Sequence, residues 1–325
     1  MMKEKLNLVE EWDKVFPKSD KVNHKKVTFK NHFGITLVAD MYEPKEYDCK
    51  LPALAVSGPF GAVKEQSSGL YAQEMAERGF LAIAFDPSYT GESSGEPRNV
   101  NSPDINIEDF QAAVDYLSNL DNVDSERIGI IGICGWGGMA LQTACIDTRI
   151  KATVTSTMYD MSRIAGNGYF DEGDNEESRY QARVSINKQR TEDFKNGEYK
   201  MQGGVIDPVP EEAPQFLKDY NAYYIQPRGF HKRSANSTTG WVVQTSTSLM
   251  NTRLFTYASE IRSAVLMIHG ENAHSCYMSR DAYKLLKGDN KELVIIPGAN
   301  HVDLYDKKDV IPFNKIEEFL KEHLK

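Results

Sequence analysis

The chain has 325 residues, of which 40% are hydrophobic and 26% are charged, and its net charge is -9. This length suits one large domain with an insertion better than two equal domains. The negative charge argues against nucleic acid and anionic membranes as partners, because both are bound through clustered Lys and Arg. No apolar run approaches the roughly 20 residues of a membrane span.

The N-terminal residues and the cysteines indicate the compartment. Acidic residues stand near the N-terminus where a signal peptide has its apolar centre, so export is not expected. The four cysteines, at positions 49, 134, 145 and 276, match no zinc pattern, and a chain of this length does not need disulfides. We therefore expect a cytoplasmic protein with free thiols, one of which is available for chemistry.

Short apolar runs alternate with helical segments along most of the chain. Strands are predicted at residues 27–31, 35–42, 51–58, 80–85, 127–133, 150–157, 264–270 and 292–297. Helices are predicted at residues 69–78, 107–120, 139–146, 279–286 and 312–324. Strands buried on both faces have unbroken apolar sequences, and their alternation with helices is typical of βαβ units. The pattern predicts an α/β protein with a mostly parallel, doubly wound, eight-stranded sheet.

Residues 162–262 interrupt this alternation with charged helical pieces, aromatic clusters and polar stretches. A connection this long inside a regular α/β pattern is usually a functional insertion. We therefore expect a first core part at 1–161, a mostly helical lid at 162–262 and a second core part at 263–325. The aromatic residues of the lid would also suit the interface of a homodimer.

Residues 128–138 place a cysteine between an apolar strand and a glycine-rich segment. The sequence Gly132-Ile-Cys134-Gly-Trp136 fits a nucleophile elbow, a tight strand-to-helix turn that presents a nucleophile above the sheet. The N–H groups of the helix that follows favour a thiolate and an oxyanion. Trp136 stands where a small residue is usual, and Gly137 and Gly138 could relieve the crowding. The alternative is that Cys134 is a small buried hydrophobe.

A thiol nucleophile needs a base, and the base needs an acid that orients it. His301 follows the last predicted strand, which is the place for the base in this chain order. The other histidines have simpler explanations. His269 ends a strand as a packed neutral imidazole, whereas His274 could contact substrate or hydrogen-bond a neighbour. The remaining four lie in polar contexts or in the lid, at positions 24, 32, 231 and 323.

Five motifs occur in an order typical of one family. They are Gly58-Pro-Phe-Gly-Ala-Val-Lys-Glu-Gln66, Phe85-Asp-Pro-Ser-Tyr-Thr-Gly-Glu-Ser-Ser-Gly95, the Cys134 elbow, Ile268-His-Gly-Glu271 and Gly298-Ala-Asn-His-Val-Asp303. With them the chain resembles a bacterial α/β-hydrolase of the dienelactone-hydrolase-like group, related to the Xaa-Pro peptidase and acetyl-esterase families. The resemblance implies the α/β-hydrolase fold and covers nearly the whole chain outside the lid.

The resemblance also implies an oxyanion hole made of two backbone N–H groups. One belongs to Gly135, and the other comes from the loop after the third strand. Pro59 has no N–H, so Phe60 is the expected donor; the alternative is that residues 58–61 form only a turn. Glu92, in the second motif, could pair with an arginine, steady the thiol or be a solvated turn carboxylate.

The acid of the triad is where this sequence departs from the family. Dienelactone hydrolases carry an aspartate where this chain has Ala273. Glu271 is the nearest carboxylate and the first candidate. Asp160, after the sixth predicted strand, is its competitor. Asp303 is only two residues from His301, and its side chain is expected to face away.

These residues predict a hydrolase that cleaves an ester, lactone or thioester of a small-molecule acyl substrate through an acyl-cysteine intermediate. The expected catalytic residues are Cys134, His301 and Glu271, and no metal or organic cofactor is needed. Two alternatives stay open: acyl transfer or C–C hydrolysis with the same triad, and a non-catalytic small-molecule receptor. Lid aromatics could bind an apolar or aromatic acyl group or form the lid's own core; they include Tyr220, Tyr223, Tyr224, Phe170, Phe230 and Trp241. Three arginines could bind a substrate carboxylate or be ordinary surface residues: Arg163, Arg179 and Arg228.

Overall fold

A single eight-stranded sheet forms the centre of the protein, in a computed structural model that describes residues 6–325. The expectation about the N-terminal segment rests partly on residues 1–5, which lie outside this range. The strand order is β1-β2-β4-β3-β5-β6-β9-β10. The strands are β1 (Val22–Lys30), β2 (Thr36–Pro44), β3 (Leu51–Ser57), β4 (Leu81–Phe85), β5 (Val123–Ile133), β6 (Ile150–Ser156), β9 (Ala264–Gly270) and β10 (Lys291–Ile296).

Only β2 runs against the other strands of this sheet. It pairs antiparallel with β1 and with β4, and the remaining neighbours pair in parallel. The predicted mostly parallel, eight-stranded α/β-hydrolase sheet is confirmed. β4 and β9 are buried along their whole length, which explains their unbroken apolar sequences.

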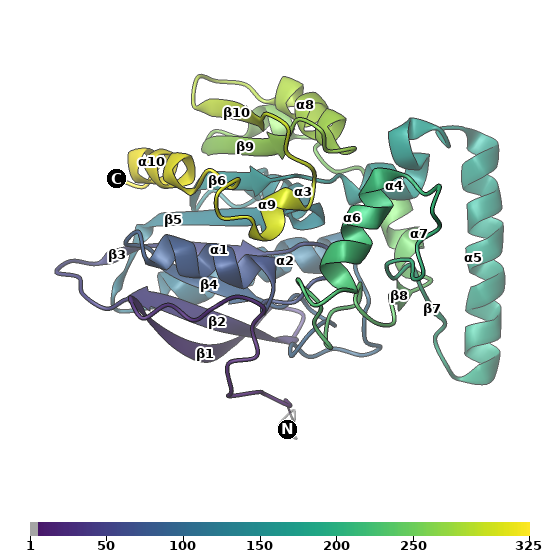
Figure 1. Ribbon diagram of the computed structural model, residues 1–325, viewed down its shortest axis with the longest axis horizontal. Coiled ribbons are helices and arrows are strands. Elements are labelled where there is room, and N and C mark those ends of the chain that lie inside the picture. Colours follow the sequence, from purple (N-terminus) through teal and green to yellow (C-terminus); the bar gives the residue numbers. More distant parts are fainter. Residues whose placement is uncertain (1–5) are drawn as a thin grey trace.

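Helices cover both faces of the sheet (Figure 1). One face carries α1 (Ser67–Ala76) and α10 (Phe313–His323). The other face carries α2 (Pro103–Ser118), α3 (Gly135–Ala144) and α8 (Cys276–Leu285). The doubly wound arrangement brings the loops after β3, β5, β6, β9 and β10 to the same end of the sheet, because these strands all run in one direction.

Residues 157–263, between β6 and β9, form what we call the cap segment. It contains α4 (Met161–Asn167), α5 (Glu176–Asn196), α6 (Gln215–Tyr224), α7 (Thr245–Met250), the short strands β7 (Met201–Gln202) and β8 (Trp241–Val242), and 3-10 turns at Tyr169–Asp171 and Ala258–Glu260. Figure 1 shows these elements at the end of the sheet where α3 begins, with α5 at the outer edge. No helix within residues 6–325 is both long and apolar enough to cross a membrane.

Candidate active site

Cys134 forms the turn between β5 and α3. Its backbone has φ 57° and ψ -127°, a strained conformation for a residue with a side chain. A Cβ atom at position 132 would lie 2.1 Å from the carbonyl oxygen of Trp136, so the turn requires glycine there. The local sequence therefore folds into a nucleophile elbow with a thiol at its tip.

Trp136 does not crowd this turn, although a small residue was expected at its position. Its side chain is 1% exposed and packs against the rings of Phe85 and Phe110 in the core. Gly138 has a separate role, because a Cβ there would lie 2.5 Å from the carbonyl oxygen of Tyr159. The glycines after the elbow thus let the chain that follows β6 approach α3.

Burial raises the pKa of the Cys134 thiol, although three hydrogen bonds oppose this effect. They would stabilise the thiolate form, and their donors are the Tyr305 hydroxyl and the backbone N–H groups of Phe60 and Gly135. The two amides expected to form an oxyanion hole thus both point at the sulfur. Asn236 holds the first one in place, because its Nδ2 donates to the carbonyl oxygen of Phe60 at 2.7 Å.

A buried ion cluster anchors the other end of the loop that carries Phe60. Lys64 Nζ lies 2.6 Å from Glu65, 2.8 Å from Asp86 and 2.6 Å from Glu92. The three carboxylates are close enough together to hold a metal ion, but the Lys64 ammonium already lies against each of them. Burial would lower the pKa of Lys64, yet the surrounding carboxylates raise it well above its ordinary value.

Glu92 belongs to this cluster and plays none of the roles considered from the sequence. It is buried and pairs with Lys64 and Lys26, and it also accepts the backbone N–H of Val9. The charged motif residues therefore tie together the loops after β3 and β4, one of which supplies the Phe60 amide. Their role is to position the backbone.

His301 is fully buried, and its Nδ1 faces hydroxyl groups. It lies 2.6 Å from Ser275 Oγ and 2.9 Å from Thr157 Oγ1. Ser275 Oγ lies 2.9 Å from His269 Nε2, and His269 Nδ1 lies 2.6 Å from Ser279 Oγ. Burial lowers the pKa of His301 well below its ordinary value and that of His269 to about 3. Both imidazoles are therefore neutral at pH 7.

The structure does not bring a carboxylate to His301. Glu271 is exposed and accepts the backbone N–H of Gly298, because its own N–H bonds to Ile296 and turns its side chain outward. Asp160 caps the start of α4, and Asp303 accepts the backbone N–H of Asn300. Within residues 6–325, none of the three carboxylates hydrogen-bonds to His301. Glu271 is thus not placed as the triad acid, and neither is its competitor.

Tyr305 is a site residue that the sequence reading missed. It lies in α9 (Asp303–Asp306), and its hydroxyl is 3.0 Å from His301 Nε2 and within hydrogen-bonding reach of the Cys134 thiol. The signal was its position four residues after His301, which puts both side chains on one face of a helical turn. Ser275 and Thr157 had no comparable signal, because they come from two separate strand ends.

A cavity of about 410 Å³ lies beside Cys134. Its wall holds Phe60, whose ring lies tilted against Trp241 at 4.3 Å between ring centroids, and apolar residues of α4 and α6. Five tyrosines line it: Tyr159, Tyr169, Tyr220, Tyr224 and Tyr305. None of the described side chains around the cavity is charged.

The cap segment contributes part of this wall, but several residues considered for substrate binding lie elsewhere. Phe170 and Phe230 are exposed, and Tyr223 is buried without lining the cavity. The three candidate arginines are paired with carboxylates: Arg163 with Asp171 and Asp281, Arg179 with Asp174, and Arg228 with Asp306. His274 lies 2.6 Å from the hydroxyl of Tyr159 and stacks on Phe216.

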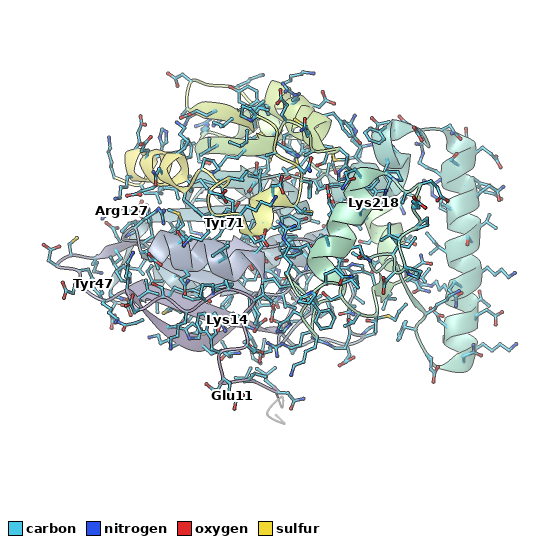
Figure 2. The ribbon with its side chains drawn as sticks, viewed as in Figure 1. Glu11, Lys14, Tyr47, Tyr71, Arg127 and Lys218 are labelled. Atoms are coloured by element: carbon cyan, nitrogen blue, oxygen red, sulfur yellow. The ribbon has the colours of Figure 1, made fainter. Side chains whose placement is uncertain are left out.

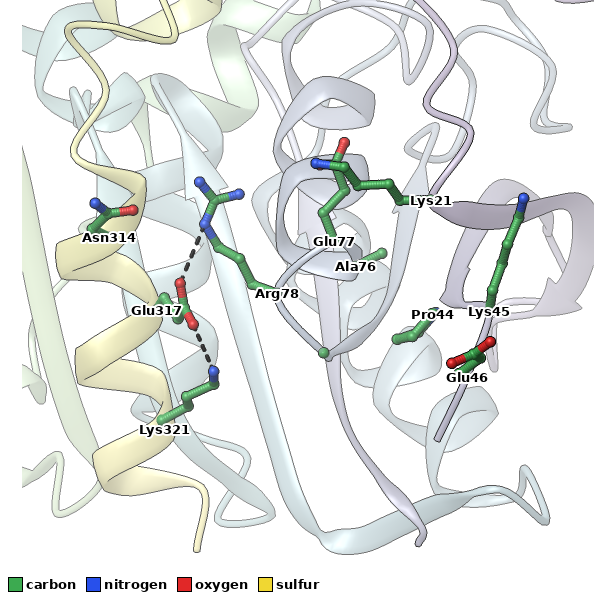
Figure 3. A pocket seen from close by; sticks show the side chains of 11 residues that line it. Lys21, Pro44, Lys45, Glu46, Ala76, Glu77, Arg78, Asn314, Glu317 and Lys321 are labelled. Carbon is green, nitrogen blue, oxygen red and sulfur yellow. Dashed lines mark hydrogen bonds and ion pairs between the residues drawn. The ribbon is translucent and has the colours of Figure 1, made fainter. Parts of the chain in front are cut away.

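A second hollow, of about 720 Å³, lies between the C-terminal end of α1 and one side of α10 (Figure 3). It is at the opposite end of the sheet from Cys134, because Gly79 precedes β4 and Pro44 ends the antiparallel strand β2. Several of its charged side chains pair with each other, as Arg78, Glu317 and Lys321 do. None of its described lining residues is a Cys, Ser or Thr, so the cavity at Cys134 is the candidate active site.

Comparison with known proteins gives a family match and extensive relatives. The sequence profile of the X-Pro dipeptidyl-peptidase (S15) family matches residues 34–303. An uncharacterized protein of Pseudomonas aeruginosa is 56% identical over 321 residues, which are 98% of this chain and 86% of that protein. The crystal structure of that hypothetical protein has a TM-score of 0.95, with 54% identity over 98% of this chain and 99% of the other.

Two further likenesses are more limited. A thiohydrolase of Aspergillus aculeatus, aneE, is 36% identical over 104 residues, which are 32% of this chain and 33% of that enzyme. The crystal structure of GrgF from a Penicillium species, described as an α/β hydrolase, has a TM-score of 0.77 at 22% identity. It covers 93% of this chain and 99% of the other, and it supports the fold alone.

Proposed function

Because the chain belongs to the X-Pro dipeptidyl-peptidase (S15) family of α/β hydrolases, we propose that it cleaves a thioester, ester or lactone of an uncharged acyl group through an acyl-cysteine at Cys134. Within the superfamily we place it, on the order of its five motifs, with the dienelactone-hydrolase-like members. The thiohydrolase named among its partial relatives is consistent with this class of substrate.

One observation carries the proposal. The thiol of Cys134 is at the tip of a strained elbow, receives the N–H groups of Phe60 and Gly135, and opens onto an uncharged cavity. A thiol held only for packing needs neither the strained backbone nor two convergent amides. The same amides would stabilise the oxyanion of a tetrahedral intermediate, by about 2.7–4 kcal/mol for each donor.

The reaction follows from these positions. The sulfur of Cys134 attacks the acyl carbonyl carbon while the thiol proton is transferred toward neutral His301. The leaving thiol or alcohol takes a proton from the imidazolium as the C–O or C–S bond breaks. His301 then takes a proton from water, and the hydroxide attacks the acyl-cysteine and releases the acid and the free thiol.

Peptides fit this site less well than esters, although the family takes its name from dipeptide cleavage. A thiolate leaves more readily than an amide nitrogen anion, so the tetrahedral intermediate of an amide reverts to the acyl substrate. A dipeptidyl-peptidase substrate also brings a free ammonium group, and none of the residues 6–325 that line the cavity is a carboxylate able to receive it.

A panel of aliphatic p-nitrophenyl esters, acyl-N-acetylcysteamine thioesters and Xaa-Pro p-nitroanilides tests the proposal. We expect turnover of the esters and thioesters, none of the anilides, and loss of all turnover in Cys134→Ala. Turnover that survives in Cys134→Ala would contradict the proposal. Binding of these compounds without turnover or covalent adduct would instead favour a small-molecule receptor.

A further inference from the structure

The hydroxyl of Tyr305 stands between the thiol and the imidazole of the site. It lies 3.0 Å from His301 Nε2 and within hydrogen-bonding reach of the Cys134 thiol. No direct hydrogen bond joins Cys134 to His301 in the described part of the chain. Tyr305 and Cys134 both line the 410 Å³ cavity, whereas His301 is not among its lining residues. The Tyr305 hydroxyl therefore lies between the imidazole of His301 and the cavity.

The position of this phenol is fixed by its surroundings. Ser67 Oγ donates to the carbonyl oxygen of Tyr305 at 2.8 Å, and the hydroxyl of Tyr71 donates to that of Leu304 at 2.7 Å. Tyr71, labelled in Figure 2, lies on α1 and so ties α9 to that helix. The ring of Tyr305 is fully buried, with the ring of Tyr223 at 5.0 Å.

The hydrogen-bond directions form one consistent chain. Ser275 Oγ lies between two imidazoles, and in the tautomer that the relay requires it donates its single proton to His269 Nε2 and accepts from His301 Nδ1–H. With the proton on Nδ1, the Nε2 of His301 has a free lone pair. In this arrangement the Tyr305 hydroxyl donates to that lone pair, and its oxygen is left as the acceptor for the proton of a neutral Cys134 thiol.

We propose that Tyr305 relays the thiol proton from Cys134 to His301 when the acyl-enzyme forms, an inference that rests on the proposed function. As the bond from sulfur to the acyl carbon forms, the thiol proton moves to the phenol oxygen. The phenol proton moves at the same time to His301 Nε2. The products are the tetrahedral intermediate, a neutral Tyr305 and an imidazolium, so protons and charge balance.

Burial makes such a concerted transfer necessary. It raises the pKa of Cys134 and lowers that of His301, so a separated thiolate and imidazolium are unfavourable before the substrate binds. Burial also raises the pKa of Tyr305 well above its ordinary value, which excludes a stable phenolate. The Tyr305 hydroxyl can therefore act only if it receives the thiol proton while it gives its own proton to His301.

The test compares the acylation rates of the wild type, Tyr305→Phe and Tyr223→Phe, from the burst of p-nitrophenolate released by p-nitrophenyl acetate. Tyr223 is the matched control, because it is also fully buried and no hydrogen bond joins its hydroxyl to Cys134 or His301 in the described part of the chain. We expect Tyr305→Phe to acylate about 100-fold more slowly, the lower end of general acid–base effects. Tyr223→Phe should acylate at the wild-type rate.

A proton inventory in mixtures of H2O and D2O adds a readout that a structural role would not change. The wild-type acylation rate should curve with deuterium fraction, because two protons move together, and the plot for Tyr305→Phe should become linear. A linear plot for the wild type, or an unchanged rate in Tyr305→Phe, would overturn the relay. Absence of any adduct on wild-type Cys134 would overturn the proposed function itself, which keeps the two failures distinct.

Discussion

The Nδ1 atom of His301 lies 2.6 Å from the hydroxyl oxygen of Ser275. In the Ser–His–Asp arrangement of other hydrolases a carboxylate occupies this place and stabilises the imidazolium. A hydroxyl orients the ring without supplying negative charge. The candidate site is therefore a neutral thiol beside a neutral imidazole, and most of its predicted behaviour follows from this neutrality.

Removal of the orienting hydroxyl should slow acylation without unfolding the protein. In Ser275→Ala, His301 loses one of its two Nδ1 partners and keeps Thr157 Oγ1 at 2.9 Å. We expect about a 10-fold lower acylation rate, which corresponds to the free energy of about one hydrogen bond. The control is Ser279→Ala, whose hydroxyl contacts His269 and not His301. An equal or larger loss in Ser279→Ala would argue against this role of Ser275.

The pH dependence of thiol alkylation should reveal the neutral pair. Iodoacetamide reacts with thiolate, and burial raises the pKa of Cys134 above its ordinary value. Its alkylation rate should therefore keep rising as the pH passes that ordinary value. Exposed Cys49 serves as an internal reference when both adducts are quantified by peptide mass spectrometry. A rate at Cys134 that is already constant near pH 6 would indicate a thiolate–imidazolium pair instead.

The decrease of kcat at low pH should depend on protonation of His301 rather than on the thiol. His301 must be neutral to accept a proton, and burial lowers its pKa well below its ordinary value. Turnover should therefore persist as the pH falls below the ordinary pKa of histidine, near 6.5. Steady-state kcat, measured on a p-nitrophenyl ester at controlled ionic strength, checks this expectation. A half-loss of kcat at pH 6.5 or above would refute a desolvated His301 as the base.

Lys64→Met should strongly destabilise the fold. The substitution leaves Glu65, Asp86 and Glu92 buried without the cation that contacts all three. Loss of one partner of a buried ion pair costs about 3–5 kcal/mol in the free energy of unfolding. Lys321→Met is the matched control, because it breaks the surface pair with Glu317 seen in Figure 3.

Urea unfolding at pH 7 measures the free energy of unfolding of Lys64→Met and of its control, Lys321→Met. The control should change the free energy of unfolding by at most about 1 kcal/mol, as is usual for exposed ion pairs. Equal stabilities for Lys64→Met and the wild type would mean that the three carboxylates are protonated or hydrated in the fold, and that the cluster does not hold the Phe60 loop.

Acyl groups with a negative charge should be poor substrates. The cavity lining has no charged side chain among the residues that the structure describes, and a buried carboxylate without a partner is costly. We expect kcat/KM for the p-nitrophenyl ester of pentanoic acid to exceed that of the glutaric acid mono-ester by about 100-fold. Leu217→Arg, which adds a cation to the cavity wall, should narrow this difference. Similar kcat/KM values for the two esters with the wild type would contradict an uncharged acyl site.

The local sequence was sufficient to predict the elbow and the sheet. Unbroken apolar runs such as β4 and β9 indicated buried parallel strands, and the glycines around Cys134 indicated the tight turn that follows β5. Chain order alone makes His301 the candidate base, because the fold fixes which strand end carries that residue. These features depend on residues that are neighbours in the sequence or on the order of the strands along the chain. Both can be inferred from a single sequence.

The hydrogen-bond partners of His301 could not be predicted from the spacing of residues along the chain. Ser275 and Thr157 follow β9 and β6, and only the packed sheet brings their hydroxyls to one imidazole. The choice of Glu271 assumed that the nearest carboxylate in sequence turns inward, whereas its backbone bond to Ile296 turns it outward. The Lys64 cluster was missed because charged residues in a loop are usually solvated, and here they pair in the interior.

Intact-protein mass spectrometry after a brief exposure to p-nitrophenyl acetate tests the acyl-cysteine most directly. It should be applied to the wild type, Cys134→Ala and His301→Ala. We predict a single acetyl adduct on the wild type, none on Cys134→Ala, and on His301→Ala one that forms slowly and persists. An adduct that remains in Cys134→Ala, or p-nitrophenolate release without any dependence on Cys134, would contradict the mechanism.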